Sequence, residues 1–174
     1  MEYIKGSDFR LHNTVVTLGK FDGLHLGHKE LIDIVLKTKG LTKVLFTFDV
    51  NPLSILSDKE FKVIETGTER INLMKDSGFD YMIDYPFTME TINTDADEFI
   101  KTIIHDKLGA KMLVVGTDFR FGKDRLGDVE LLEKRSKEYG YVLKVIEKKK
   151  MYGEEVTDWN FMETALIRKM KRQT

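Results

Sequence analysis

The stretch that decides the fold is Gly19-Lys20-Phe21-Asp22-Gly23-Leu24-His25-Leu26-Gly27-His28. It follows a β-branched run at 14–18, which predicts a strand. It precedes an apolar pattern, starting at Leu26, that predicts a helix ending near Gly40. Its glycines permit tight turns, and the N-terminus of the helix offers free N–H groups and a partial positive charge. The stretch therefore predicts a phosphate-binding corner between the first predicted strand and the first helix.

His25 and His28 are the candidate catalytic side chains of this corner. Three residues apart at a helix start, they share one face, and an imidazole donates hydrogen bonds to phosphate in its neutral or charged form. A metal pair or a structural role are the alternatives, but His12 and His105 offer no evident third ligand. We favour the phosphate role and assign no metal ligand. The Gly-x-x-x-x-Gly-Lys-Ser/Thr pattern is absent, so the corner is not a P-loop.

Strands and helices alternate along the rest of the chain. Further strands are predicted at 43–48, 79–83, 111–115 and 141–146, and further helices at 68–78, 95–109, 128–140 and about 160–171. This alternation predicts the α/β class: a doubly wound parallel sheet of the Rossmann-like type, with helices on both faces. Two prolines and the absence of low-complexity sequence favour a single domain over 1–174. Its ligands are expected beyond the carboxyl ends of the strands.

The composition excludes several classes of function. The 174 residues are 41% hydrophobic and 33% charged, which is typical of a soluble globular protein. The formal net charge of -1 gives no overall positive charge of the kind that attracts nucleic acid. The absence of cysteine excludes disulfides, thiolate metal sites and a cysteine nucleophile. No apolar run approaches the roughly 20 residues that span a bilayer, and no signal peptide is evident, so we expect a cytoplasmic protein. The sequence leaves the oligomeric state open.

Two more segments carry candidate binding residues at predicted strand ends. In the loop 116–127, Phe119 and Phe121 either stack on a planar ring or anchor the loop. Arg120 and Arg125 either hold phosphate by bidentate hydrogen bonds or are solvated. In the segment 46–52, Asp49 either faces a metal-bound phosphate or caps a turn, and we slightly favour the turn.

In this order and spacing, the three segments resemble the prokaryotic FAD synthetases, which are bifunctional riboflavin kinase/FMN adenylyltransferases. The resemblance is to their N-terminal adenylyltransferase module and covers nearly the whole chain. Two motifs carry it: Gly-x-Phe-Asp-Gly-x-His-x-Gly-His at 19–28, and Val-Gly-Thr-Asp-Phe-Arg-Phe-Gly at 115–122. The flanking 107–110 and 127–132 fit the same pattern.

The resemblance implies transfer of AMP from ATP to FMN, giving FAD and pyrophosphate, with Mg²⁺ carried by the nucleotide. The FMN phosphate would attack the α-phosphorus of ATP in line, without a covalent enzyme intermediate. The implied nucleotide-binding residues are Gly19, Phe21, Asp22, Gly23, His25, His28, Thr164 and Arg168. The implied flavin-binding residues are Phe48, Asn51, Pro52, Asp118, Phe121, Gly122 and Arg125.

Two departures from the family pattern keep alternatives open. Asn51 stands where the family usually has histidine, which motivates a nucleotidylyltransferase with another phosphorylated acceptor. Met162–Arg168 stands where the family usually has Ile-Ser-Ser-Thr-x-Ile-Arg, and Glu163 adds negative charge there. This second departure motivates a paralogue that binds flavin or nucleotide without efficient catalysis. The chain also ends where the riboflavin kinase barrel of the family would begin.

Overall fold

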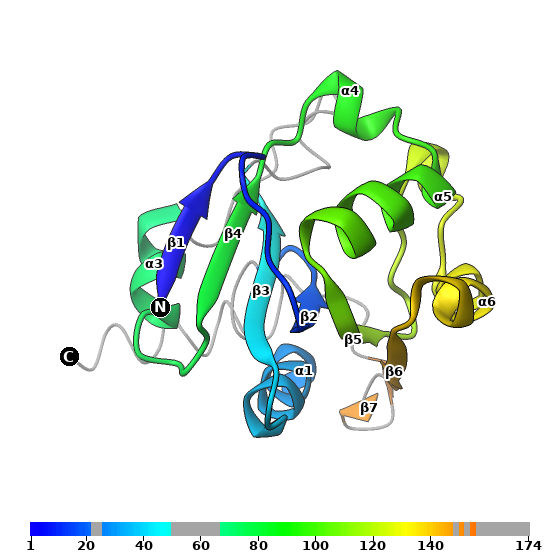
Figure 1. The fold of residues 1–174 in the computed structure, drawn as a ribbon. Helices are drawn as coiled ribbons and strands as arrows, with labels where there is room; N and C mark the ends of the chain where they lie inside the picture. The colour runs from blue at the N-terminus through cyan, green and yellow to red at the C-terminus, as the bar shows by residue number, and fades with distance from the viewer. Residues whose placement is uncertain (22–25, 50–66, 148–149, 152–153, 156–174) are drawn as a thin grey trace.

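Six parallel strands form the central sheet in a computed structural model that describes residues 1–21, 26–49, 67–147, 150–151 and 154–155 (Figure 1). They are β1 (Glu2–Lys5), β2 (Thr14–Leu18), β3 (Thr42–Phe48), β4 (Tyr81–Tyr85), β5 (Ala110–Gly116) and β6 (Val142–Ile146). Their order across the sheet is β1-β4-β3-β2-β5-β6. A short antiparallel pair, β7 (Lys150–Met151) and β8 (Glu154–Glu155), forms a separate sheet.

The helical segments connect these strands. They are α1 (Leu26–Lys37), α3 (Gly67–Met74), α4 (Met89–Ile92), α5 (Ala96–Phe99), the π-helix η1 (Ile100–Lys107), the 3₁₀ turn η2 (Lys123–Arg125) and α6 (Val129–Tyr139). α5 and η1 run on without a break, and the bond from Leu108 N to Ile103 O, 2.9 Å long, shows the wider π spacing. The helix predicted at 95–109 is therefore present, but its second half is wound as a π-helix.

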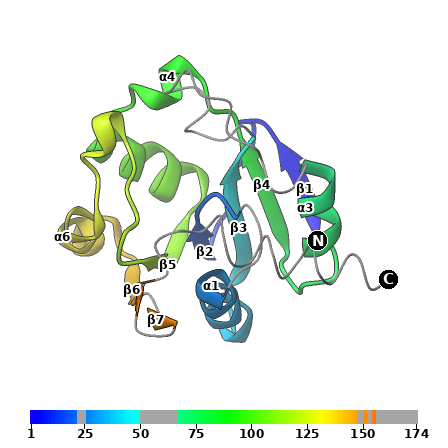
Figure 2. The same ribbon diagram turned by 180° about the vertical axis from the view of Figure 1, so that it is seen from behind.

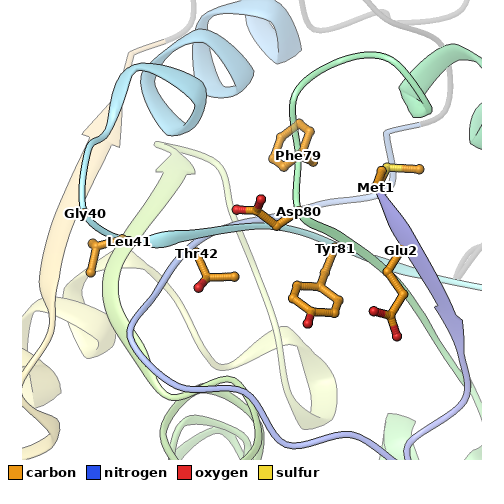
Figure 3. A pocket seen from close by; sticks show the side chains of 8 residues that line it. All are labelled: Met1, Glu2, Gly40, Leu41, Thr42, Phe79, Asp80 and Tyr81. Atoms are coloured by element: carbon orange, nitrogen blue, oxygen red, sulfur yellow. The ribbon is translucent and has the colours of Figure 1, made fainter.

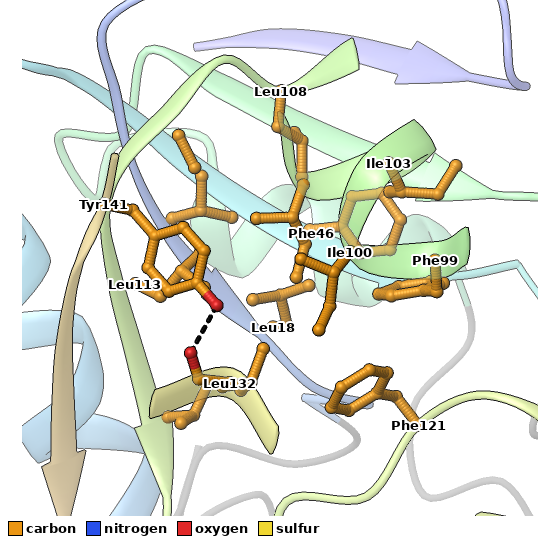
Figure 4. Packing of buried hydrophobic residues seen from close by; sticks show 14 of the residues in the cluster. Leu18, Phe46, Phe99, Ile100, Ile103, Leu108, Leu113, Phe121, Leu132 and Tyr141 are labelled. Carbon is orange, nitrogen blue, oxygen red and sulfur yellow. Dashed lines mark hydrogen bonds between the residues drawn. The ribbon is translucent and has the colours of Figure 1, made fainter. Parts of the chain in front are cut away.

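Helices cover both faces of the sheet, as Figures 1 and 2 show from opposite sides. Neighbouring strand residues belong to opposite core clusters because side chains alternate across a strand. Val15, Leu45 and Met82 pack with α1 and α3, whereas Val16 and Phe46 pack with α5, η1 and α6. Figure 4 shows the second cluster, in which the Tyr141 hydroxyl donates to the carbonyl oxygen of Leu132. The doubly wound parallel α/β sheet that the sequence predicted is thus confirmed.

Two aspartates begin helices as the sequence pattern indicated. Asp95 precedes α5, and its side chain accepts hydrogen bonds from Asp97 N at 2.9 Å and Glu98 N at 3.3 Å. Asp128 precedes α6 and accepts from Leu131 N at 2.9 Å. Each carboxylate satisfies N–H groups that the first helical turn leaves without intrahelical partners.

The structure differs from the prediction at β1, β4 and α3. β1 was not predicted, because four residues with exposed ends carry little apolar signal at the edge of a sheet. The third predicted strand, 79–83, lies two residues later as β4 and so includes Asp84. Thr68 lies inside α3 rather than preceding it. The predicted helix at 160–171 lies outside the described residues.

The path of the chain creates a switch point beside β2. From β2 the chain winds outward through β3 to β4, adjacent to β1, and then returns to β5 on the other side of β2. In open α/β sheets, ligands bind where the winding reverses, beyond the carboxyl ends of the strands. The fold therefore points to the ends of β2 and β5.

Candidate functional site

The two motif-bearing segments follow adjacent strands. β2 and β5 pair in parallel, with Thr17 opposite Val114, so the segments starting at Gly19 and Gly116 leave the sheet side by side. β3 lies on the other side of β2, so the segment after Phe48 leaves the same edge. The topology thus brings the starts of all three predicted segments to one edge of the sheet, as a shared ligand site requires.

Phe21 and His28 form a packed pair at the corner. Phe21 is fully buried, and its ring centroid lies 4.8 Å from that of His28, which is 8% exposed. Phe21 has a φ of 48°, a left-handed conformation that costs a non-glycine residue about 1–2 kcal/mol. A Cβ on Gly19 would lie 3.2 Å from the Phe21 ring, so glycine leaves room for this packing. The buried Phe21 ring thus lies against His28 at the start of α1.

A polar network lies behind this corner. Each of β2, β3 and β4 has a buried polar residue on the face covered by α1 and α3: Thr17, Thr47 and Asp84. The Thr47 hydroxyl donates to the carbonyl oxygen of Lys20 at 2.9 Å. Arg70 of α3 donates to the same oxygen at 3.3 Å and to Asp84 Oδ1 at 3.0 Å.

Asp84 joins this network to the first strand. The Tyr3 hydroxyl donates to Asp84 Oδ2 at 2.9 Å, so both carboxylate oxygens accept a hydrogen bond. Burial, together with the neighbouring Asp84 carboxylate, raises the pKa of Tyr3 to about 12. Tyr3 is therefore a neutral donor throughout the physiological pH range.

The segment after β3 is packed against the end of β4. Asp49 accepts a hydrogen bond from Phe87 N at 3.0 Å, and its own N–H donates to the carbonyl oxygen of Tyr85 at 3.0 Å. Phe48 is half-buried and contacts Phe87 edge to face at 5.1 Å. Asp49 thus links the ends of β3 and β4 through a residue distant in the sequence, whereas the turn cap that we slightly favoured would be a local bond.

The loop after β5 is closed by Phe121 and Gly127, which bond to each other through both backbone groups at 2.9–3.0 Å. The Phe121 ring is 6% exposed and packs on Phe99 at 5.4 Å, with Phe119 stacked against it at 5.6 Å. In this structure the Phe121 ring therefore packs as part of the core and holds the loop against α5, while its predicted contact with the flavin stays a prediction.

Steric limits fix the tip of the same loop. Gly122 has a φ of 71°, and a Cβ there would lie 2.8 Å from Ala96 Cα, so no larger residue fits without a shift. Asp124 and Arg125 both have positive φ, at 53° and 58°. Such strain is characteristic of binding loops. The exposed side chains of Asp118 and Arg125 lie in this loop.

Seven of the fifteen predicted site residues lie outside the described residues. The predicted residues without a described position are Asp22, Gly23, His25, Asn51, Pro52, Thr164 and Arg168. Their roles in nucleotide and flavin binding stay predictions, as do those of the residues whose positions are given above.

Sequence reasoning missed Arg70, Asp84 and Tyr3. A strand-parity signal was available for Asp84, because it lies two residues after the buried Met82 and so shares its face. Arg70 precedes the buried Met74 by four residues and so lies on the same side of α3. Charged residues at inward positions of α3 and β4 were thus the sequence signal for the buried ion pair between Arg70 and Asp84.

A surface depression lies at the opposite edge of the sheet (Figure 3). Its walls come from the amino ends of β1, β3 and β4: Met1, Glu2, Gly40, Leu41, Thr42, Phe79, Asp80 and Tyr81. The Asp80 carboxylate there accepts a hydrogen bond from Lys43 N at 2.8 Å. Because ligands of such sheets bind at the carboxyl edge, this depression is not the candidate site.

The described part of the chain gathers no three histidine or acidic side chains that would hold a metal ion. Nor does it contain a helix long and apolar enough to cross a membrane.

Comparison with curated proteins finds relatives in bacteria. The proteins named bifunctional riboflavin kinase/FMN adenylyltransferase from Buchnera aphidicola (strain Sg) and Escherichia coli K12 are 34% and 33% identical over 139 and 131 residues. These matches cover 78% and 73% of this chain, and 44% and 42% of the relatives. A Listeria monocytogenes FAD synthetase is 32% identical over 129 residues, covering 72% of this chain and 52% of that protein. The chain thus spans about half the length of these relatives.

One solved structure and one family model also match this chain. A crystal structure titled macrolide-efflux protein, from Streptococcus pneumoniae, superposes with a TM-score of 0.73 at 25% identity, covering 90% of this chain and 53% of that one. The profile described as FAD synthetase matches residues 8–160, which include both motifs at the ends of β2 and β5. On this match, the chain belongs to the FAD synthetase family.

Proposed function

We propose that this chain is an FMN adenylyltransferase, which transfers AMP from ATP–Mg²⁺ to FMN. The observation that carries the proposal is the position of the two family motifs, which follow β2 and β5 on either side of the switch point of the sheet. The names of the relatives support the same activity. We place the reaction in the cytoplasm.

In the proposed reaction, an oxygen of the FMN phosphate attacks the α-phosphorus of ATP. The new bond is the phosphoanhydride of FAD, and the bond between the α-phosphorus and the bridging oxygen to the β-phosphorus breaks. Its electron pair leaves with pyrophosphate. No side chain is modified, so catalysis consists of aligning the two phosphates and stabilising the charge on the leaving group. Mg²⁺ enters as part of the nucleotide substrate.

The corner between β2 and α1 supplies the proposed nucleotide site. His25 and His28 would donate to phosphate oxygens, together with the N–H groups at the start of α1. Phe21 is fully buried against His28 in this structure, so its proposed contribution is to hold that imidazole in place. Gly19 provides the space for this packing.

The ends of β3 and β5 supply the proposed flavin site. Phe48 lies at the end of β3, and the loop 116–127 leaves the same edge. Phe121 would act by anchoring that loop, because its ring is buried on Phe99. The exposed Asp118 and Arg125 are the side chains of the described loop that we assign to polar contacts with FMN.

The test is formation of FAD from FMN and ATP–Mg²⁺ by the purified chain, followed by chromatography and by release of pyrophosphate. We expect FAD and pyrophosphate in equal amounts. Absence of turnover at micromolar enzyme would reject the proposal. Titration of flavin fluorescence then identifies a paralogue that only binds, because quenching would occur without FAD. Faster pyrophosphate release with another phosphorylated acceptor would identify a different substrate.

A further inference from the structure

A largely buried cation lies directly behind the predicted phosphate-binding corner. The Arg70 side chain is 12% exposed, and its Nη2 lies 3.0 Å from Asp84 Oδ1, whose side chain is 5% exposed. Its Nη1 donates to the carbonyl oxygen of Lys20 at 3.3 Å. Lys20 is the second residue of the corner, between Gly19 and Phe21. One guanidinium thus connects α3, β4 and the corner.

Two donors fix the orientation of the Lys20 peptide. Its carbonyl oxygen accepts from the Thr47 hydroxyl at 2.9 Å as well as from Arg70. The peptide bonds of the described residues are trans. In a trans peptide the C=O and the following N–H point in opposite directions. The two donors therefore turn the N–H of Phe21 away from Arg70.

Stability alone is a weak explanation for this ion pair. Removing two charges from water is costly, and apolar residues of similar volume often replace a buried pair without loss of stability. Arg70 Nε is also buried without a hydrogen-bond partner among the described residues, which adds to the cost. The pair is better explained by the geometry that it enforces on the Lys20 carbonyl.

We propose that Arg70 is a positioning residue for nucleotide binding. By holding the Lys20 carbonyl, it keeps the corner in the conformation that presents the N–H of Phe21 and the start of α1 to the phosphates of ATP. Asp84 holds the guanidinium in place. The inference rests on the proposed function, because it takes a nucleotide as the ligand of the corner. Arg70 itself does not contact the nucleotide.

The test removes both charges together, in the double variant Arg70→Met/Asp84→Leu. This avoids the unpaired buried carboxylate that Arg70→Met alone would leave. Asp84→Leu also removes the acceptor of the Tyr3 hydroxyl, so we expect the double variant to fold with a modestly lower melting temperature. Its KM for ATP should rise about 10- to 100-fold, as is typical when a supporting residue is lost. The KM for FMN should change by less than about threefold, because the flavin does not use this corner.

Arg135→Met is the matched control. Arg135 pairs with Asp97, with 2.6 Å between Nε and Oδ1, but its side chain is 30% exposed and it lies on α6, over the opposite face of the sheet. We expect its KM for ATP to be unchanged. An unchanged KM for ATP in a folded double variant would overturn the proposal, as would equal increases for ATP and FMN.

Two further measurements keep the test decisive. If the double variant does not fold, Arg70→Lys keeps the charge but loses the planar fork that reaches two acceptors. It should stay folded with a raised KM for ATP, and an unchanged KM would overturn the inference. If the unmodified chain makes no FAD, the proposed function fails, and the dissociation constant of a non-hydrolysable ATP analogue then tests Arg70 on its own. Failure of the unmodified chain to bind this analogue would overturn both.

Discussion

Replacing His28 separates its packing role from its proposed chemical role. The His28 ring is 8% exposed and contacts Phe21 at 4.8 Å, so it contributes to the packing of the corner. His28→Ala should therefore cost about 2 kcal/mol of unfolding free energy, from the lost ring contact and the space left behind. His28→Phe keeps a ring over Phe21 and should cost less than His28→Ala does.

The two variants should agree in activity although they differ in stability. Both lack the imidazole donors, and losing one donor to developing charge typically reduces turnover about 10²- to 10³-fold, or about 2.7–4 kcal/mol. FAD formation at saturating ATP and FMN, with denaturant unfolding of the same samples, gives both quantities. His28→Gln retains an amide donor and should be more active than His28→Phe. A His28→Phe variant with turnover within about threefold of the unmodified chain would refute the reasoning, because His28 would then be a packing residue only.

Three other perturbations test the described structure. Gly122→Ala should lower the free energy of unfolding by about 1–3 kcal/mol in a denaturant titration. The alanine Cβ would lie 2.8 Å from Ala96 Cα, at a φ of 71° that favours glycine. Unchanged stability would contradict this loop geometry. The pKa of Tyr3 is raised to about 12 in the folded state, so its neutral hydroxyl stabilises the fold fully below pH 10, and this stabilisation is lost as pH rises from 10 to 12. Tyr3→Phe, which also breaks the bond to Asp84, should therefore make the free energy of unfolding fall less steeply between pH 10 and 12. Arg125→Gly removes the steric strain of a φ of 58°, so the free energy of unfolding should be unchanged or up to about 1 kcal/mol higher. The same variant should bind FMN more weakly in a flavin-fluorescence titration, and unchanged affinity would show that Arg125 is not part of the flavin site.

Periodicity predicted the interior of the sheet well, because buried parallel strands are continuous apolar runs. The strand predicted at 14–18 coincides with β2, and all five of its residues are buried. β1 escaped the same reasoning, since Tyr3 and Ile4 are partly buried between two exposed ends. Its position becomes clear only from its partner β4, which a local pattern does not reveal. For the same reason, the Tyr3–Asp84 bond was beyond local sequence reasoning.

The site was predictable as motifs and much less so as contacts. Glycines and histidines of 19–28 indicated an anion site at a helix start, and the fold brings that helix to the switch point. The sequence left open whether Phe121 stacks on a ligand or anchors its loop, because an aromatic side chain suits either role. In this structure its ring packs on Phe99, and its contact with the flavin stays a prediction. Arg70 required knowledge of three elements at once, namely α3, β4 and the corner.

The pairing of β2 with β5 has a consequence for synthesis on the ribosome. Thr14 lies opposite Ala110, so the neighbour of β2 on that side does not exist until the roughly 90 residues that follow β2 have been made. Parallel sheets with such distant partners fold slowly. A nascent chain stalled before β5 would carry β2 with an open hydrogen-bonding edge, the kind of surface that chaperones shield from aggregation. A nascent chain would therefore be able to bind a ligand at the β2–β5 edge only after β5 had been translated.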